Sequence, residues 1–383
     1  MAYLDAASTA EFREVDDIIV KTISHTMRKY WTNPSTLYAT DVKDEINKCR
    51  EQVAKFIGAK PNEIYFTSGA SESNNWAIRG WVDRALAENS GMINVITTPT
   101  EHKSILEAIE NLNLGAIVKK CDVDEFGLVD IDSLKRLLWI RTDEPTLVSI
   151  CMANNEIGTI QNIKEISKIV HSYNGVLHVD ATQAFGHIPI DVEKLGIDMM
   201  SASGHKISPV LKGVGFLYKT NMIDIQPLIY GTQENGLRGG TENVFGIVGL
   251  GKALEYCDVS QKKIDEMCAK RDYFIELLKS KFDVKLNGHL TQRLPNNINV
   301  TFPQNIMGES LLYMLGMSGI QISTGSACNS KSIEPSHVLK AIGLSSEKAM
   351  RTVRFTLPES VAFEDIDWII TEIDKAIRII EIV

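Results

Sequence analysis

Short apolar runs and amphipathic stretches alternate along most of this chain, and this alternation limits the possible fold more than any other sequence feature. From about residue 60, the runs that have the pattern of buried strands are 64–67, 93–97, 116–120, 147–152, 176–181, 198–203 and 214–218. The segments between them, such as HKSILEAIENL and IKEISKIVHSY, carry apolar residues at helical spacing. Strands alternating with helices predict an α/β fold whose mainly parallel sheet is covered by helices on both faces.

The pattern changes after about Gly249. A long charged helical stretch runs to about Lys281 and is followed by NINVTF, a helix near residues 308–317, GIQIS, VRFTL and a final helix. This order is typical of a smaller α+β domain. We therefore predict a large domain over residues 13–250 and a small domain made of residues 1–12 and 251–383.

Composition and charge exclude several classes of function. The formal net charge is −9 and no cluster of Lys and Arg is dense enough to follow a phosphate backbone, so we expect no direct nucleic-acid partner. No apolar run approaches the roughly 18 residues that span a bilayer. The start, MAYLDAAST, does not have the pattern of a signal peptide, and we expect a cytoplasmic protein. The six cysteines form no CxxC pair, which predicts neither a metal site nor a disulfide framework.

Polar residues stand where several predicted strands end, and in open α/β sheets ligands bind beyond the carboxyl ends of the strands. TSGASES (67–73) follows a strand and opens a helix, so its backbone N–H groups and the hydroxyls of Ser71 and Ser73 can hold a phosphate at the positive helix end. The alternative for this motif alone is ordinary helix capping.

Three further residues follow neighbouring strands. Asp180 ends the apolar run HVDATQ, where a carboxylate needs a cationic or hydrogen-bonding partner unless it only caps a helix. Asn155 in NNEIG offers an amide, although such loops are common. Lys206 in SGHK lies one strand beyond Asp180, and its alternative is a solvated lysine. A phosphate cradle, a carboxylate, an amide and a lysine at one sheet edge fit pyridoxal 5′-phosphate, which such a lysine binds covalently.

Motifs along nearly the whole chain resemble those of the cysteine desulfurases, a group within the class V aminotransferase family that supplies sulfur for iron–sulfur clusters and thiolated nucleosides. In order, they are YLDAAST, NPS, FTSGASESNN, TEHKS, NNEIG, HVDATQ, SGHK, LRGGTEN, STGSAC, EPSHVL and RFTLP. The resemblance implies the fold of type I pyridoxal-phosphate enzymes, with a mainly parallel seven-stranded sheet in the large domain and a smaller α+β domain. It also implies that L-cysteine is the substrate.

The resemblance implies a role for each matching residue near the cofactor. Lys206 is the implied attachment point, Asp180 holds a proton on the pyridine nitrogen, and His102 stacks on the ring and handles protons. Outside this context, His102 would equally be an exposed histidine at a helix start. The other implied cofactor contacts are Ala70, Ser71, Asn155, Gln183, Ser203 and His205.

Four residues are implied to act at the cofactor's periphery or on the substrate. Thr241 in RGGT would reach the phosphate of a neighbouring subunit, which implies a symmetric homodimer. Arg354 in VRFTL would clamp the substrate carboxylate, assisted by Asn33; the alternative is a structural arginine paired with a core carboxylate. Arg238 either shapes its loop or adds charge beside the substrate.

Cys328 in STGSAC is implied to be the nucleophile of the reaction. Its small and glycine-containing surroundings predict a mobile loop, whereas Cys151 in LVSICM has the pattern of a buried strand thiol. The expected products are L-alanine and a persulfide on Cys328, from which a protein acceptor takes the sulfur.

Some positions depart from the family pattern, and two other functions stay open. ISPVLKGVG after Lys206 is one residue longer than usual and YGTQEN replaces a common glycine triplet, so we expect the loop on the phosphate side to differ. The chain ends soon after its last helix, at IRIIEIV, which puts docking to a cluster-assembly scaffold in doubt. The alternatives are a selenocysteine lyase or another class V aminotransferase activity, and a non-catalytic regulatory partner of a sulfur-transfer complex.

Overall fold

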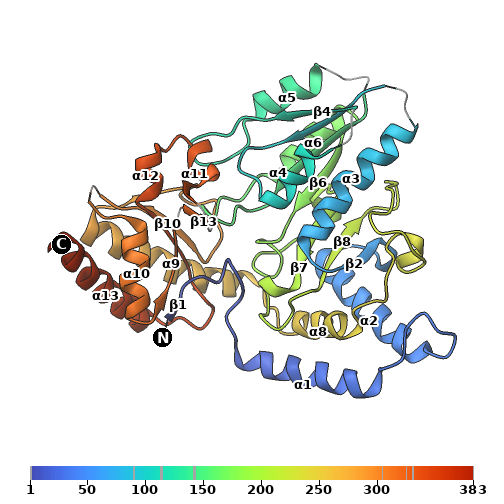
Figure 1. Cartoon of the computed structure of the whole chain (residues 1–383), viewed down its shortest axis with the longest axis horizontal. Helices are drawn as coiled ribbons and strands as arrows, with labels where there is room; N and C mark the ends of the chain where they lie inside the picture. The colour runs from blue at the N-terminus through green and yellow to red at the C-terminus, as the bar shows by residue number, and fades with distance from the viewer. Residues whose placement is uncertain are drawn as a thin grey trace.

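The computed structural model describes residues 2–88, 91–112, 115–140, 144–303, 305–324, 326–329 and 332–382, with the backbone alone for 326–329, 332 and 333. Figure 1 shows two units side by side. The larger unit contains a seven-stranded sheet, and the smaller one contains a four-stranded sheet and the end of the chain.

The seven predicted strands all form and make one sheet in the order β2-β8-β7-β6-β5-β3-β4. Their bounds are β2 Ile64–Thr67, β3 Ile93–Thr97, β4 Ala116–Lys120, β5 Thr146–Cys151, β6 Val176–Asp180, β7 Met199–Ser203 and β8 Gly215–Lys219. Strand β8 is antiparallel to its neighbours β2 and β7, and all other pairs are parallel. The parallel strands β3 to β7 therefore end at the same edge, as the prediction of a mainly parallel sheet requires.

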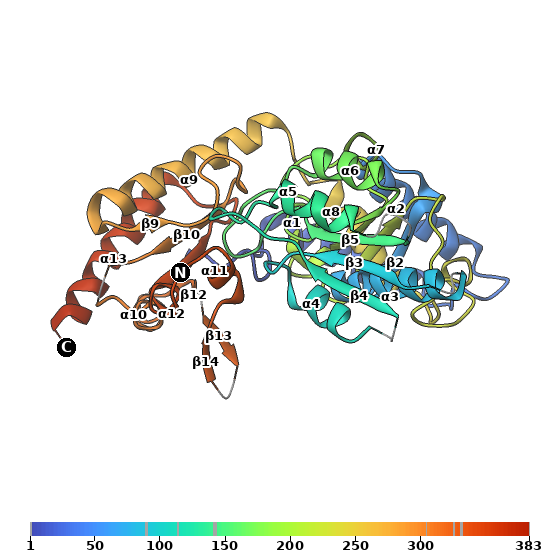
Figure 2. The same ribbon diagram turned by 90° about the horizontal axis from the view of Figure 1, so that it is seen from above.

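Helices cover both faces of this sheet because its strands are apolar on both sides. On β2, Ile64 and Phe66 belong to one core cluster, whereas Tyr65 between them packs edge-on against Trp76 in the cluster of the other face. Figure 2 shows α4 and α6 on opposite sides of the sheet. Helices α3 Ala70–Glu88 and α4 Lys103–Glu110 cover one face. The other helices of this unit are α1 Glu14–Lys29, α2 Thr40–Ile57, α5 Ile131–Trp139, α6 Ile163–Ser172, α7 Val192–Leu195 and α8 Val244–Leu254, with 3-10 turns η1 Pro61–Glu63, η2 Gly204–Lys206 and η3 Glu234–Gly236.

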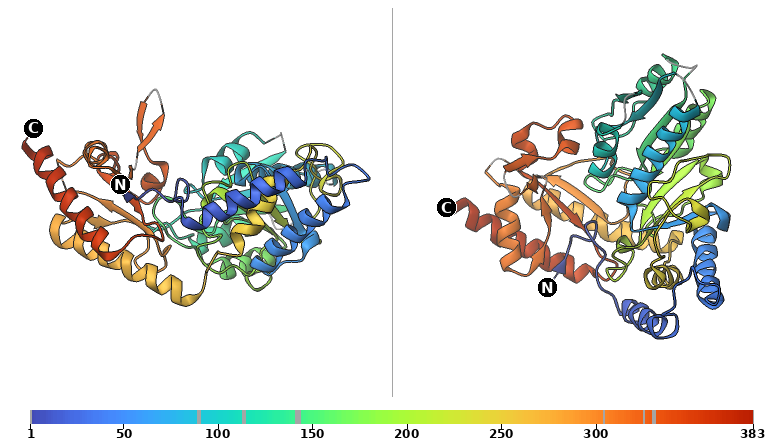
Figure 3. Two further views of the ribbon diagram at one scale, coloured as in Figure 1. Left: turned by 90° about the horizontal axis from the view of Figure 1, so that it is seen from below. Right: turned by 45° about the vertical axis from the view of Figure 1, so that its right-hand side comes forward.

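The smaller unit is an α+β arrangement, as predicted. Its antiparallel sheet has the order β12-β15-β10-β9, and a short parallel pair joins β1 to β11. Figure 3 shows the gold helix α9 and the dark red helix α13 packed beside this sheet. The bounds are β1 Ala2–Tyr3, α9 Gln261–Phe282, β9 Lys285–Leu286, β10 Asn297–Thr301, α10 Gly308–Met317, β11 Ile320–Gln321, β12 Ser323–Thr324, α11 His337–Ala341, α12 Ser346–Met350, β15 Thr352–Thr356 and α13 Phe363–Ile382.

The two hydrophobic cores indicate where the chain passes between the units. Helix α8 runs through residue 250, and Leu254 at its end still packs in the core of the large sheet. The core of the small unit contains Leu4 from the start of the chain and resumes at Met267. These clusters favour a crossing between Leu254 and Met267, and the boundaries given above stay a prediction.

The described ranges contain neither a membrane-spanning helix nor a cluster of potential metal ligands. None of their helices combines the length and apolar character needed to cross a bilayer. Within the same ranges, no three His, Cys, Asp or Glu side chains are grouped so that they could hold a metal ion.

Candidate active site

A cleft of about 680 Å3 lies where β5, β6 and β7 end and helices α3 and α4 begin. Strand ends and helix starts meet there because parallel strands connected by helices all point to one edge. The predicted site residues that line this cleft are Ala70, Ser71, His102, Asn155, Asp180, Gln183, Ser203, His205, Lys206 and Arg354. Segments up to 347 residues apart in the printed sequence, from Ala7 to Arg354, thus contribute to one surface.

The start of α3 and the end of β7 form one end of the cleft. Ala70 and Ser71 are the first residues of α3, and Ser203 is the last residue of β7. The turn before α3 lies close against β8: a Cβ on Gly215 would stand 2.6 Å from the Cα of Gly69. Only glycine permits this approach. The unpaired N–H groups and the dipole of a helix start favour an anion at this end.

The negative charge of Glu72, which lines the same end, is compensated by Arg238. The guanidinium donates from Nε to Oε1 at 2.8 Å and from a terminal nitrogen to Oε2 at 3.1 Å, and the backbone N–H of Ser68 donates to Oε2 at 2.8 Å. Burial alone would raise the pKa of Glu72, but these bonds lower it. Arg238 therefore shapes its loop, one of the two roles considered for it. Lys212, in the segment of unusual spacing, also lines the cleft.

Lys206 follows β7 in the short turn η2, adjacent to the strand that carries Asp180. Its ammonium group donates to the carbonyl oxygens of Ala7 at 2.7 Å and Ser8 at 2.8 Å. Burial, followed by the charge of Arg354, lowers the pKa of Lys206 to about 8. The amine is thus far easier to deprotonate than that of an exposed lysine, as a covalent role requires.

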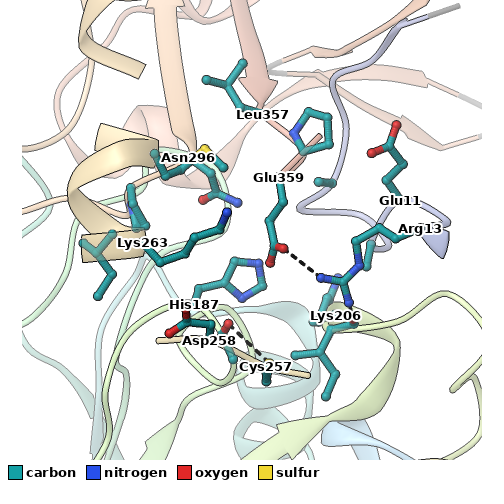
Figure 4. A pocket seen from close by; sticks show the side chains of 18 residues that line it. Glu11, Arg13, His187, Lys206, Cys257, Asp258, Lys263, Asn296, Leu357 and Glu359 are labelled. Carbon is teal, nitrogen blue, oxygen red and sulfur yellow. Dashed lines mark hydrogen bonds and ion pairs between the residues drawn. The ribbon is translucent and has the colours of Figure 1, made fainter. Parts of the chain in front are cut away.

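A second cavity of about 60 Å3 lies behind Lys206, between the two units (Figure 4). Arg13 borders it, forms an ion pair with Glu359 at 3.0 Å and donates to the carbonyl of Ile207 at 2.7 Å. Arg13 thus connects Ile207, the residue after Lys206, to Glu359 of the small unit. Burial lowers the pKa of His187 and raises that of Cys257 to about 12, so both side chains in this cavity are neutral near pH 7.

Asp180 ends β6 and is 5% exposed. Its Oδ2 accepts from Nδ2 of Asn74 at 2.8 Å, and its Oδ1 accepts from the backbone N–H of Thr182 at 2.9 Å and from the Thr182 hydroxyl. Donors on both oxygens stabilise the carboxylate despite its burial. Nearby, burial raises the pKa of Glu101 to about 8, so this neighbouring carboxyl is mostly protonated at neutral pH.

His102 is the exposed N-cap of α4, as the alternative considered for it requires, and it also lines the cleft. Its Nδ1 accepts from the backbone N–H of Ser104 at 3.1 Å and lies 2.8 Å from the Ser104 hydroxyl, which in turn contacts Nδ2 of Asn74 at 2.9 Å. Burial lowers the pKa of His102.

Sequence reasoning missed Asn74, Ser104 and Thr182, although each falls inside a motif quoted for the family. ESNN contains two asparagines in succession, and nothing in the sequence tells which one turns inward. In the fold Asn74 is completely buried, whereas Asn75 is half-buried. The side chain that meets Asp180 is therefore selected by the position of α3 over the sheet.

Arg354 lines the cleft but has a carboxylate partner of its own. It pairs with Asp5, contacts the Ser8 hydroxyl at 3.2 Å and donates to the carbonyl of Asn155 at 3.0 Å. Its Nε has no hydrogen-bond partner within the described residues. Nε2 of Gln183 donates to the carbonyl of Ala7 at 2.9 Å. This geometry fits the alternative of a structural arginine paired with a carboxylate. The carboxylate is that of Asp5 in YLDAAST, a residue to which no role was assigned from the sequence.

Two predicted residues do not line the cleft of their own chain. Asn33 lies in the exposed loop between α1 and α2, where its side-chain oxygen accepts from the backbone N–H of Ser35 at 2.9 Å. Thr241 lines a separate pocket of about 120 Å3 that also includes Ser68 and Gly213. The roles assigned to Asn33 and Thr241 therefore stay predictions.

Cys328 lies on a strand, where a loop was predicted. Strand β13, Ser326–Asn329, pairs antiparallel with β14, Ser332–Pro335, and places Cys328 opposite Ile333. The loop prediction is therefore wrong for this backbone segment, because small polar residues opposite a β-branched one still complete a ladder. In Figure 2 the two strands project from the small unit. The Cys328 side chain lies outside the described part of the structure.

The other cysteines are unsuited to act as thiolates. Cys151 is buried in β5 as predicted, and burial raises its pKa well above the ordinary value. Burial likewise raises the pKa of Cys49 to about 12 and of Cys121 to about 11, and it raises that of Cys268. Every cysteine whose side chain is described is thus held in the thiol form at neutral pH.

Comparison with known proteins places this cleft in a family. The model of the family described as aminotransferase class-V matches residues 2–369. The cysteine desulfurase IscS of Dictyoglomus turgidum is 43% identical over 382 residues, which cover 98% of this chain and 94% of that protein. A solved NifS-like protein matches with a TM-score of 0.88 and 34% identity over 99% of both chains. The structure titled SspA in complex with cysteine matches with a TM-score of 0.81 and 34% identity over 94% of this chain and 100% of that one. The chain therefore belongs to the class V aminotransferase family.

Proposed function

We propose that this protein is a cysteine desulfurase, which uses pyridoxal 5′-phosphate to convert L-cysteine into L-alanine and keeps the sulfur as a persulfide on Cys328. The observation that carries the proposal is the pairing, in one cleft, of an easily deprotonated Lys206 with a buried and hydrogen-bonded Asp180. The names of the relatives support the same reaction, since those at 40–44% identity are cysteine desulfurases.

The residues present fit the cofactor at three points. Lys206 has the lowered pKa that a covalent attachment needs, and Asp180 is a carboxylate that can hold a proton on a ring nitrogen. At the far end, the start of α3 with Ser71 offers donors to a phosphate, and Arg238 neutralises the one carboxylate there, Glu72. We assign Ala70, Ser203 and His205 to the same phosphate end, and Asn155 and Gln183 to the ring.

The cofactor, when bound, supplies an acceptor for the electrons of the substrate's α-carbon. The chain supplies the proton transfers around that carbon. The Lys206 amine takes the α-proton, because burial and Arg354 favour its neutral form. Asp180, held by Asn74 and Thr182, is the carboxyl that would keep a proton on the ring nitrogen. We assign Arg354, whose guanidinium lines the cleft, to the substrate carboxylate, while Asp5 and Ser8 hold the guanidinium in place.

Cys328 takes the sulfur. Its thiolate attacks the substrate sulfur, an S–S bond forms, and the C–S bond breaks with its electron pair going to the β-carbon. A proton then converts that carbon into the methyl group of alanine. One enzyme thiol and one L-cysteine thus become one enzyme persulfide and one L-alanine, and no outside oxidant is needed. A thiol of an acceptor protein then removes the terminal sulfur.

Two copies of the chain form the active unit in this proposal. Trp31, Leu37 and Tyr38 are 77%, 86% and 95% exposed in the loop between α1 and α2, and Tyr230 is 78% exposed nearby. The two loops touch, since Nε2 of Gln233 donates to the Ser35 hydroxyl at 3.0 Å. So many exposed aromatic and aliphatic side chains on adjoining loops indicate an interface. In a symmetric dimer formed through this surface, Thr241 would contact the cofactor phosphate of the other copy. Asn33 would contact the substrate bound to the other copy.

Incubation with L-cysteine tests the reaction directly. We expect the purified holoprotein to release L-alanine and, with a reducing thiol present, an equal amount of sulfide. An aminotransferase would instead consume a keto acid without releasing sulfide, and a regulatory partner would do neither. A selenocysteine lyase would release alanine from L-selenocysteine but not from L-cysteine. Absence of alanine from L-cysteine would therefore reject the proposed function.

The pKa of Lys206 predicts how cofactor loading depends on pH. Covalent attachment requires the neutral amine, so the initial rate of reconstitution of the apoprotein is expected to rise with pH with a midpoint near 8. An unperturbed lysine would place this midpoint about two units higher, near 10.4. The measurement is absorbance at the cofactor band over a pH series that brackets 8. A rate that keeps rising steeply to pH 10 would contradict the assigned environment.

A further inference from the structure

A chain of short contacts links Asp180 to His102 through two side chains that the proposed mechanism does not use. Nδ2 of Asn74 lies 2.8 Å from Oδ2 of Asp180 and 2.9 Å from the hydroxyl oxygen of Ser104. That hydroxyl oxygen lies 2.8 Å from Nδ1 of His102. The four residues come from the end of β6, from α3, and from the start of α4, so the path exists only in the folded protein.

The carboxylate at one end determines the direction of every bond in this path. An ionised carboxylate only accepts hydrogen bonds, so Asn74 must turn its NH2 group towards Asp180. The same nitrogen donates its second hydrogen to the Ser104 oxygen. The reverse amide orientation would set an oxygen against the carboxylate and leave the NH2 group of a completely buried residue without a partner. Ser104 thus accepts from Asn74 and keeps its own hydroxyl hydrogen to donate.

Nδ1 of His102 is therefore approached by two donors. One is the Ser104 hydroxyl at 2.8 Å, and the other is the Ser104 backbone N–H at 3.1 Å. A ring nitrogen that accepts from two donors cannot carry a hydrogen itself. The proton of the neutral imidazole is then on Nε2, the nitrogen that is left to face the cleft.

We propose that Asn74 and Ser104 are positioning residues that hold His102 as the Nε2–H tautomer, so that its ring meets the substrate as a hydrogen-bond donor. This inference rests on the proposed function, together with the position of His102 against the cofactor ring that the family resemblance implies. A donor stabilises the negative sulfur or oxygen atoms that develop there, and the role of base is left to the Lys206 amine. The two roles thus fall to different residues: Lys206 accepts the proton, and His102 donates a hydrogen bond.

The surroundings of His102 agree with a neutral ring. A second proton on Nδ1 would point at the Ser104 backbone N–H, so the imidazolium loses the bond from that group. Burial also lowers the pKa of His102. The charged and titratable groups that face it are Asp180 and Glu107, which raise its pKa, and Lys206 and His337, which lower it. Removal of a donor from Nδ1 is therefore expected to raise this pKa and to admit the other tautomer.

Nitrogen NMR of the holoprotein labelled with 15N-histidine tests the inference without turnover. The chain has eight histidines, and H102Q identifies the signals of His102. In the wild type we expect Nδ1 in the unprotonated range and Nε2 in the protonated range. In Ser104→Ala the two signals should move towards each other, because loss of a donor lowers the tautomer ratio by about tenfold, the factor that one hydrogen bond contributes. Asn74→Ala should act in the same direction.

Two further variants separate this role from general damage to the fold. Ser104→Thr keeps a hydroxyl and should keep the wild-type signals. Asn75→Ala is the matched control, because Asn75 is the next residue of α3 and its amide donates to the backbone carbonyls of Ser71 and Ser104, and among the described residues to no side chain of the path. Unchanged His102 signals in Ser104→Ala and Asn74→Ala, or a protonated Nδ1 in the wild type, would overturn the inference. Since the tautomer is read without substrate, this result is independent of whether L-cysteine is turned over.

Discussion

Lys206→Ala is expected to abolish covalent attachment of the cofactor and to lower turnover by at least about 10⁴-fold, the upper range for a positioned proton-transfer group. The reason is that one amine serves two purposes in the proposal, as the attachment point and as the base at the α-carbon. It stands just after β7, beside the strand that carries Asp180, which is the position both roles require. The measurement is intact mass after borohydride reduction of the holoprotein.

Lys212→Ala is the matched control for this variant. Lys212 also lines the cleft, but it is exposed and lies in the segment between η2 and β8. The reduced Lys212→Ala protein should gain the mass of one cofactor, like the wild type, even if the phosphate is bound more weakly. A reducible adduct that persists in Lys206→Ala would show that the attachment point lies elsewhere.

Cys328→Ser is expected to keep the cofactor and its absorbance but to lose sulfur transfer by at least about 10³-fold, because a serine hydroxyl does not ionise at neutral pH as a thiol partly does. Incubation with L-cysteine should add the mass of one sulfur to the wild type, and peptide mapping should place it on Cys328. The variant should gain no sulfur. It should still bind L-cysteine, because no cofactor contact is removed.

Cys268→Ser controls for the loss of a thiol in the same unit. Cys268 is half-buried on α9, and burial raises its pKa. This variant should form the persulfide like the wild type. If Cys328→Ser became labelled with sulfur while Cys268→Ser did not, the nucleophile would be misassigned.

The fold was largely predictable because its signals are local. Six of the seven strands are buried almost throughout, and such a strand needs a short apolar run whatever surrounds it. The edge strand β4 begins with the apolar residues of AIVKK and ends with two exposed lysines. The helix at Gly308–Met317 and the long helix that ends at Phe282 follow from apolar spacing in the same way. The structure of the segment around Cys328 was harder to predict, because small polar residues occur in loops and in strands alike. It forms a strand because β14 pairs with it.

The sequence by itself determined which residue types stand at the strand ends: Lys206, Asp180 and Ser71 all lie in the cleft. The expectation that Ser73 also faces a phosphate is wrong, because its hydroxyl is fully buried against Thr67 and the Gly69 carbonyl. Only the tertiary structure decided how each is held. Arg354 meets Asp5 from the far end of the chain, and Asn74 rather than Asn75 reaches Asp180. Strand patterns depend on neighbours in the chain, whereas the proton position on His102 depends on a path through three separate elements that meet only when the chain has folded.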